Sequence, residues 1–399
     1  MLEGRDLLIF GSDWDWFPSI MKHIALNLTS KNRILWVGSV SIRTPRLRMY
    51  DVRRTVARMS SFLTANRRST EGRAPVAEVH PFIIPFYDIR AVRKINDAIL
   101  RKTLLKRIKE LGFRDLVVFP STPVVAGIIG TLGESSSHYF CVDDYTQYDG
   151  AYRSVKSLEE EIIGKVDSCF AVSEPLLNTR KVKSGENHFL PTGVDTDHFC
   201  PTNDPTPSDI ASVGRPIAGF IGLLGTYVDI DLIVRCARAY PETSFVVIGR
   251  SMVDLSLFNN VPNIRFLGEV SYDKLPRYSQ MFDVGLNPRI INELTMAMNP
   301  LKIVEYLSMG MPVVSTDTPS VRNFRGSVYI AETKEQFVEM VGAALRDTDP
   351  EKKNSRREVA KKYSWIAVTQ RVSEIVDRID REKQSASGRL QRMPAPQNE

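Results

Sequence analysis

The stretch Asn299-Pro-Leu-Lys-Ile-Val-Glu-Tyr-Leu-Ser-Met-Gly-Met-Pro-Val-Val-Ser315 predicts a helix that leads directly into a buried strand. Pro300 stands where the first turn of a helix begins, and Gly310 stands where the helix ends. Lys302 and Glu305 are three residues apart, so they share one face of that helix. A helix start with free amide groups and a nearby lysine suits a phosphate, whereas a carboxylate one turn later suits ribose hydroxyls. The alternative is an ordinary surface ion pair, which contributes only about 0.3–0.5 kcal/mol.

Short apolar runs alternate with helical patterns on both sides of this stretch, which predicts an α/β fold with parallel, doubly wound sheets. The expected strands of the first half are residues 7–10, 33–38, 77–82, 116–119, 138–142 and 168–172, and its expected helices include 89–111 and 157–166. The expected strands of the second half are 217–221, 244–248, 264–267, 284–287 and 312–316, with a helix at 229–239.

A proline-rich stretch separates the two halves, and a chain of 399 residues is long enough for two domains. We therefore expect two Rossmann-like domains that face a ligand-binding cleft. The expected parts are an N-terminal domain at 1–199, a linker at 200–216, a C-terminal domain at 217–364, a helix at 365–380 that packs back on the N-terminal domain, and a disordered tail at 381–399.

Composition excludes several classes of protein. Hydrophobic residues make up 43% of the chain and charged residues 25%, which is typical of a soluble globular enzyme. The four cysteines are far apart and the five histidines show no ligand spacing, so neither disulfides nor a metal site is expected, and a reducing cytoplasm is the natural location. We expect no signal peptide and no transmembrane segment, because the longest apolar stretch, residues 116–132, is interrupted by prolines and glycines.

Positive charge is concentrated in one region of the first half. Residues 43–114 contain eighteen Lys and Arg against six Asp and Glu. Within it, Arg46, Arg48, Arg53 and Arg54 alternate with apolar residues, which predicts binding to an anionic membrane surface. The alternatives are a solvated charged face or nucleic-acid binding, and the second is disfavoured because no reader motif accompanies the charge.

The pattern N-x-x-K-x-x-E-Y-x-x-x-G-x-P-V-V beginning at Asn299 resembles the donor-binding helix of GT-B glycosyltransferases, especially glycosyltransferase family four and its relatives in exopolysaccharide synthesis. The resemblance implies that Glu305 binds the nucleotide ribose and that Lys302 approaches the diphosphate, with Asn299 and Leu301 beside them. Many members of that family place another glutamate eight positions before the ribose-binding one. Here that position is Ala297, so the usual sugar contact from it is not expected.

Two further loops resemble parts of the family's donor site. The loop after strand 217–221 contains Gly222 and Gly225, and small residues there let the backbone approach the donor phosphates. It lacks the basic residues that many members carry, and Arg250 and Arg289 are candidates to supply that charge. Residues 266–278 resemble the loop that holds the base, with backbone groups near Glu269 and Val270 as its contacts. An ordinary turn is the alternative for each loop.

Acidic residues follow two expected strands of the first half. Residues 139–143 resemble the Y-x-x-x-D segment of xanthan-type glucuronosyltransferases, in which the aspartate acts as the base, so Asp143 is the candidate base with Asp144 next to it. The alternative is a helix N-cap. After the first strand, Asp13, Trp14 and Asp15 offer carboxylates and an aromatic face to an acceptor sugar, although a structural loop is an equally good interpretation.

The resemblance covers most of residues 7–380 and is densest in the C-terminal half. It implies a glycosyltransferase of hexosyl- or glucuronosyl-transferring type, with the donor on the C-terminal domain and the acceptor on the N-terminal domain. The expected donor is a UDP-sugar or GDP-sugar, with UDP favoured, and no cofactor or metal is expected. The expected acceptor is a lipid-linked molecule or a saccharide in cell-surface polysaccharide synthesis, at the inner face of the plasma membrane. The alternatives are a GT-B sugar-nucleotide epimerase and a catalytically inactive, membrane-docked scaffold.

Overall fold

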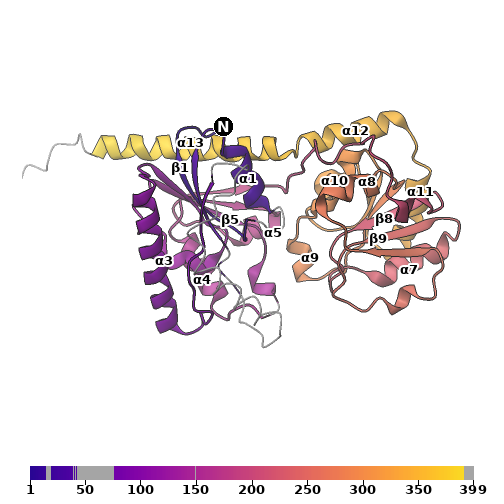
Figure 1. Ribbon diagram of the computed structural model, residues 1–399, viewed down its shortest axis with the longest axis horizontal. Helices are drawn as coiled ribbons and strands as arrows, with labels where there is room; N and C mark the ends of the chain where they lie inside the picture. The colour runs from indigo at the N-terminus through magenta and orange to yellow at the C-terminus, as the bar shows by residue number, and fades with distance from the viewer. Residues whose placement is uncertain (15–18, 39, 41, 43–75, 149, 391–399) are drawn as a thin grey trace, which may run out of the picture. The chain divides into compact units, whose positions relative to one another are not determined.

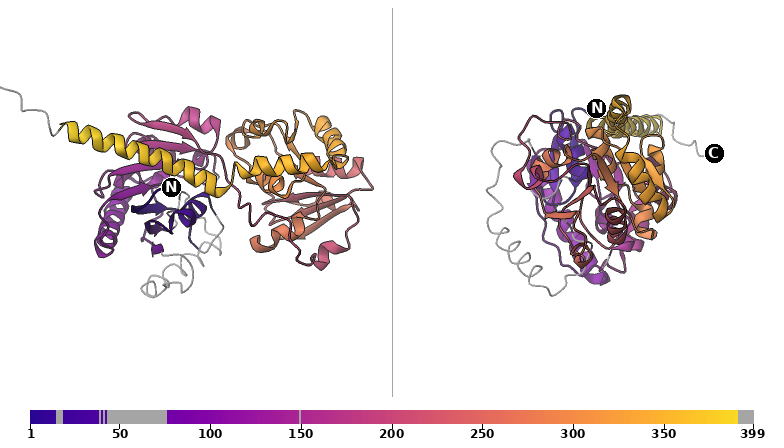
Figure 2. Two further views of the ribbon diagram at one scale, coloured as in Figure 1. Left: turned by 90° about the horizontal axis from the view of Figure 1, so that it is seen from above. Right: turned by 90° about the vertical axis from the view of Figure 1, so that its right-hand side faces the viewer.

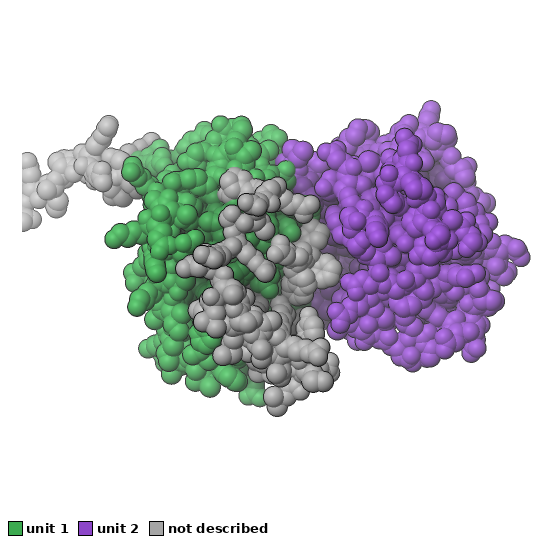
Figure 3. All heavy atoms as spheres, in the orientation of Figure 1, with its two compact units in different colours: residues 1–172, 176–190, 368–399 green, residues 173–175, 191–367 purple. Residues whose placement is uncertain are grey.

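The computed structural model describes residues 1–14, 19–38, 40, 42, 76–148 and 150–390. The chain forms two compact units, which Figure 3 shows in different colours. Unit 1 consists of residues 1–172, 176–190 and 368–399, and unit 2 consists of residues 173–175 and 191–367. No helix in the described ranges is long and apolar enough to cross a membrane.

Unit 1 is built on a seven-stranded parallel sheet with the order β3-β2-β1-β4-β5-β6-β7 (Figure 1). Its strands are β1 (Asp6–Phe10), β2 (Arg33–Val37), β3 (Val76–Val79), β4 (Leu116–Phe119), β5 (Ser136–Cys141), β6 (Ser168–Ala171) and β7 (Glu186–Phe189). Every residue of β1, β4, β5 and β6 is buried, and the apolar runs that this burial requires are clearest in β1 and β4. Strand β7 was not predicted, because it is half-buried throughout and only one of its four residues is strongly apolar.

The helices of unit 1 are α1 (Ile20–Leu28), α3 (Arg90–Glu110), α4 (Val155–Ile163), α5 (Glu174–Thr179) and most of α13 (Trp365–Leu390). A 3-10 helix, η1 (Pro123–Ile128), follows β4. Figure 2 shows α13 lying across unit 1.

Helix α13 corrects one prediction. It continues to Leu390, so the expectation of disorder from residue 381 is wrong for residues 381–390, while residues 391–399 lie outside the described part of the chain. Lys383 explains why the helix continues, because its ammonium group contacts the backbone oxygen of Ser135 and the carboxylate of Asp167, both at 2.8 Å.

Unit 2 contains a six-stranded parallel sheet with the order β10-β9-β8-β11-β12-β13. Its strands are β8 (Ile217–Ile221), β9 (Ser244–Ile248), β10 (Ile264–Gly268), β11 (Val284–Asn287), β12 (Val313–Thr316) and β13 (Tyr329–Ala331). One face is covered by α7 (Ile230–Ala239) and α11 (Lys334–Leu345), and the other by α8 (Leu275–Ser279), α10 (Leu301–Met309) and α12 (Pro350–Lys361). In each unit the strand order reverses beside the first strand, and ligands of such sheets bind at the carboxyl ends of the strands.

Residues 200–216, which the sequence suggested as a linker, belong to unit 2 and contain the short helix α6 (Ser208–Ala211). Ile210 and Val213 are buried in the core beneath α8 and α10. The hydroxyl of Tyr278 donates to the carboxylate of Asp209 and ties the segment to α8. The prolines therefore shape a packed segment of the second unit.

Candidate functional site

The carboxylate of Glu305 lies at the centre of the site that the sequence predicted in unit 2. The residue is only 2% exposed, so an ordinary surface ion pair is excluded. Its Oε2 accepts a hydrogen bond from Lys302 Nζ at 2.5 Å, while no donor in the described chain contacts its buried Oε1. Burial raises the pKa of Glu305, and the ammonium group of Lys302 opposes that rise. A buried acceptor without a donor costs free energy, so Oε1 is suited to a ligand hydroxyl.

Packing holds α10 at this position. Ile303 and Leu307 are fully buried, as their spacing of one turn predicts. The hydroxyl of Tyr306 accepts a hydrogen bond from the backbone N–H of Ile221 at 2.7 Å, which joins the helix to the end of β8. Gly310 has a φ of 82° and ends the helix in the left-handed conformation that glycine favours.

The start of α10 is open to a ligand. Pro300 precedes the first helical residue, Leu301, and no side chain caps the helix. Leu301 packs against the core, Asn299 is half-buried, and Lys302 Nζ lies 5.9 Å from the centre of the Phe199 ring. The backbone N–H of Ile303 donates to the Pro300 oxygen at 3.2 Å, whereas those of Leu301 and Lys302 have no acceptor among the described residues. These two N–H groups lie beside a positioned ammonium group, a combination that favours an anion.

The carboxyl ends of three neighbouring strands are in direct backbone contact. The N–H of Gly222 donates to the oxygen of Ile248 at 2.9 Å, and the N–H of Gly249 donates to the oxygen of Gly268 at 2.7 Å. A Cβ on Gly249 would lie 1.9 Å from the Gly222 oxygen, so no side chain fits there. The sequence singled out Gly222 but missed the other two glycines, although each lies at the carboxyl end of an expected strand.

Arg289 and Arg250, the two candidate cations, differ in how firmly they are held. The guanidinium of Arg289 lies 5.2 Å from the centre of the Tyr227 ring, and its Nε donates to Asn287 Oδ1 at 3.1 Å. Burial lowers the pKa of Arg289, and no carboxylate of the described residues pairs with it. Arg250 is exposed. A Cβ on Gly225 would lie 2.7 Å from the Tyr227 ring, so this glycine makes room for the aromatic support of Arg289.

The loop after β10 contains a stacked pair that the sequence did not reveal. The ring centres of His198 and Tyr272 lie 4.6 Å apart, and His198 Nε2 lies 2.9 Å from the backbone oxygen of Tyr272. Burial, together with the nearby carboxylate of Glu305, raises the pKa of Tyr272. Glu269 is exposed, whereas Val270 packs against the core. Because His198 is far from this loop in the sequence, the spacing of the two residues could not predict that their rings stack.

In unit 1 the two adjacent aspartates have different surroundings. Asp144 Oδ1 accepts hydrogen bonds from the backbone N–H of Thr146 at 3.1 Å and from Arg180 Nη2 at 2.8 Å. It caps the 3-10 helix η2 (Tyr145–Gln147), as the N-cap alternative predicted. Asp143 is half-buried; its Oδ1 accepts a hydrogen bond from the backbone N–H of Asp144 at 3.0 Å and its Oδ2 accepts one from the hydroxyl of Tyr148. Both carboxylates accept hydrogen bonds, and Asp144 also pairs with Arg180, so Asp143 stays the candidate base.

The loop after β1 is only partly described. Asp13 Oδ1 lies 3.9 Å from His80 Nδ1, beyond the end of β3. Trp14 is 7% exposed and packs edge-on against Trp36 at 4.9 Å, so the structure gives it a packing role. Asp15 lies outside the described residues, and so do the four arginines of the predicted membrane-binding stretch, Arg46, Arg48, Arg53 and Arg54.

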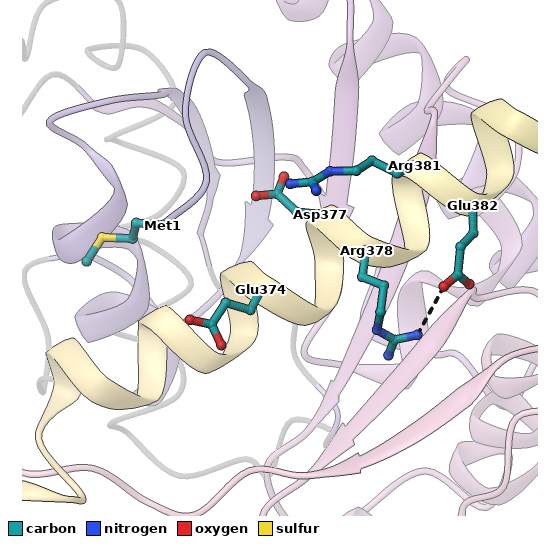
Figure 4. Close-up of a pocket in the computed structure, with 6 residues that line it drawn as sticks. All are labelled: Met1, Glu374, Asp377, Arg378, Arg381 and Glu382. Atoms are coloured by element: carbon teal, nitrogen blue, oxygen red, sulfur yellow. Dashed lines mark ion pairs between the residues drawn. The ribbon is translucent and has the colours of Figure 1, made fainter.

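A hollow beside α13 is lined by Met1, Glu374, Asp377, Arg378, Arg381 and Glu382 (Figure 4). Arg378 pairs with both Glu382 and Glu186, and none of the residues that the sequence singled out lines this hollow. Across the described ranges, no group of three or more His, Cys, Asp or Glu side chains is arranged to hold a metal ion, and the expectation of a metal-free site stays a prediction.

The chain is similar to several known proteins in sequence and in fold. Residues 215–347 match the family model described as Glycosyl transferases group 1. TuaH of Bacillus subtilis (strain 168), provisionally named as a teichuronic acid biosynthesis glycosyltransferase, is 26% identical over 226 residues, which are 53% of this chain and 57% of that relative. The chain thus matches little more than half the length of this curated relative.

Two solved structures resemble the whole described chain. HepE of Anabaena, in complex with UDP and glucose, has a TM-score of 0.64 at 11% identity, covering 94% of this chain and 99% of that one. A sucrose-phosphate synthase from Thermosynechococcus elongatus has a TM-score of 0.66 at 12% identity, with the same coverage. These likenesses confirm the predicted GT-B fold.

Proposed function

We propose that this chain, which carries a glycosyl transferases group 1 domain at residues 215–347, is a glycosyltransferase that uses a UDP-sugar. The observation that carries the proposal is the buried carboxylate of Glu305, with one oxygen held by Lys302 and the other without a donor in the part of the chain that is described. Ribose hydroxyls would donate to that oxygen. The complex of HepE with UDP and glucose supports UDP over GDP as the nucleotide.

The leaving diphosphate would bind at the start of α10. The uncapped first turn supplies amide groups, and Lys302 and Arg289 supply positive charge. Fixed donors and cations of this kind stabilise the charge that develops on a leaving diphosphate. We therefore propose transfer without a bound metal ion or cofactor.

The acceptor would bind to unit 1, with Asp143 as the base. Asp143 follows β5 and Asp13 follows β1, so both lie at the carboxyl edge of the same sheet, where ligands of such folds bind. A half-buried carboxylate held by the Tyr148 hydroxyl is suited to accept a proton from an acceptor hydroxyl. We propose an acceptor in cell-surface polysaccharide synthesis, lipid-linked or saccharide, used at the inner face of the plasma membrane. The name of TuaH, which refers to teichuronic acid biosynthesis, supports the synthesis of such a polymer.

Transfer of labelled sugar from a panel of UDP- and GDP-sugars to lipid-linked acceptors tests the proposal. We expect Asp143→Asn to lower transfer about 10²- to 10⁴-fold while UDP affinity, measured by calorimetry, is unchanged. Asp144→Asn is the matched control, because asparagine also caps helices and should keep most of the activity. Full activity of Asp143→Asn would exclude this residue as the base. Donor turnover that needs no acceptor would instead identify an epimerase.

A further inference from the structure

The loop between β3 and α3, residues 80–89, presents large apolar side chains to solvent. Phe82 is 51% exposed, Phe86 49% and Ile89 53%. Single exposed apolar residues are common on soluble proteins, but three within eight positions form an apolar patch of the kind found at interaction surfaces. The loop begins at the carboxyl end of β3, on the sheet edge where Asp13 and Asp143 lie.

This loop is anchored from beneath. The buried side chain of Asn96 accepts from the backbone N–H of Ile84 at 2.9 Å and donates to its oxygen at 2.8 Å. Tyr87 is buried, and Asp88 accepts a hydrogen bond from the backbone N–H of Ser154 at 2.8 Å. These contacts hold the loop in a conformation in which the apolar side chains are exposed.

Helix α3, which follows the loop, is strongly basic. It contains eight Lys and Arg against two acidic residues. Its buried residues recur every fourth position, at Asn96, Leu100, Leu104 and Ile108, so one side of the helix faces the unit and the opposite side faces solvent. Figure 1 shows α3 on the outside of unit 1.

The solvent side of α3 combines unpaired cations with a further apolar residue. Lys94, Lys102 and Lys109 are exposed and form no ion pair with any described residue. Ile95, 49% exposed, directly follows Lys94 on this helix. The acid Glu110 is already engaged by neighbouring basic residues of the helix, so it does not neutralise this face.

We propose that loop 80–89 and the solvent side of α3 together form a docking surface for an anionic lipid bilayer. Ammonium groups would bind lipid phosphates, and the phenylalanine and isoleucine side chains would enter the headgroup region. Nucleic acid would use the cations but leave the apolar side chains exposed, so a bilayer accounts for both features. One part of this proposal rests on the proposed function, namely that the surface holds a lipid-linked acceptor near the sheet edge that carries Asp143.

Sedimentation of the full chain with vesicles tests this surface without any donor or acceptor. Vesicles of phosphatidylglycerol and phosphatidylcholine should bind the protein, and vesicles of phosphatidylcholine alone should bind it much less. Lys94→Gln/Lys102→Gln/Lys109→Gln should weaken binding to the anionic vesicles about a hundredfold. Phe82→Ser/Phe86→Ser should weaken it about tenfold or more, with thermal unfolding checked for each variant.

Matched control variants distinguish binding through this surface from binding through the overall positive charge of the chain. Lys181→Gln/Lys183→Gln/Arg371→Gln removes the same charge from exposed positions outside α3, and Leu26→Ser removes an exposed apolar side chain from α1. Both should bind vesicles as the wild type does. Wild-type binding by the α3 and loop variants, or binding of the chain to DNA but not to vesicles, would overturn the proposal. If the wild type transferred no sugar but these variants lost vesicle binding, the proposed docking surface would be supported and the proposed glycosyltransferase function would be rejected.

Discussion

Glu305 in unit 2 and Glu159 in unit 1 are both helical carboxylates, only 2% and 4% exposed, and burial raises the pKa of both. Their hydrogen bonds differ. Glu159 accepts from the Tyr139 hydroxyl at 3.0 Å on Oε1 and from Arg180 Nε at 3.1 Å on Oε2. Glu305 has only Oε2 occupied, by Lys302. Full pairing is typical of a buried structural carboxylate, whereas the oxygen of Glu305 that has no donor among the described residues, near the open start of α10, is suited to a ligand hydroxyl.

The Glu159 pair also supports the candidate base. Arg180 contacts Glu159 through Nε and Asp144 through Nη2, so one guanidinium joins α4 to the loop that carries Asp143. In unit 1, Arg180 therefore holds the loop that carries Asp143 through a network in which both oxygens of Glu159 accept hydrogen bonds. In unit 2, only one oxygen of Glu305 accepts a hydrogen bond from a described residue. Three predictions test whether this difference is one of function.

The largest expected effect is that of Arg180→Ala on stability. Removing the guanidinium leaves Glu159 buried without its cation, which should lower the free energy of unfolding by about 3 kcal/mol in a denaturant titration. Arg235→Ala is the control, because it breaks an exposed ion pair with Asp231 and should cost much less. Equal losses in the two variants would contradict a structural role for the buried network.

A smaller effect is expected for Glu305→Ala, and in a different measurement. Loss of a charged acceptor for ribose hydroxyls should weaken UDP binding about ten- to a hundredfold by calorimetry, with much less effect on stability than Arg180→Ala. Glu293→Ala removes an exposed glutamate from the nearby helix α9 (Glu293–Ala297) and should leave UDP affinity unchanged. An unaltered affinity in Glu305→Ala would remove Glu305 from the donor site.

The smallest effect is a pH dependence. The folded chain holds the proton of Glu305 more tightly than the unfolded chain does, because burial raises this pKa above its ordinary value of 4.5. The resulting stability is present below pH 4.5 and is lost as the pH rises through the folded pKa. Glu305→Gln should remove this part of the pH dependence in unfolding titrations. UDP affinity of the wild type should increase over the same rise in pH, since the ionised carboxylate is the better acceptor, and a flat profile would contradict this.

Much of the fold was predictable from the sequence because its strands are buried on both faces. The expected ranges for β4, β8, β9 and β11 match the structure, since a parallel strand covered by helices reads as one apolar run. Strands β7 and β13 were missed because they are short and mostly half-buried, which leaves no clear pattern. Helix α13 was predicted too short, because contacts with residues far away in sequence hold its second half.

The site was predictable only where its geometry is local. A spacing of three residues in a helix places Lys302 and Glu305 on one face, and Gly310 ends that helix, whatever surrounds it. The stacked pair of His198 and Tyr272, by contrast, joins segments that are distant in sequence.

The meeting of an ammonium group and a carboxylate at the start of α10 is therefore already contained in the sequence, because helical geometry needs no information beyond the neighbouring residues. The burial of Glu305, and the lack of a donor for one of its oxygens within the described chain, arise from tertiary packing. Exposure and hydrogen-bond satisfaction depend on which distant segments, such as those of Phe199 and Tyr272, pack around the helix. That packing makes the difference between a surface ion pair and a group suited to bind a ligand.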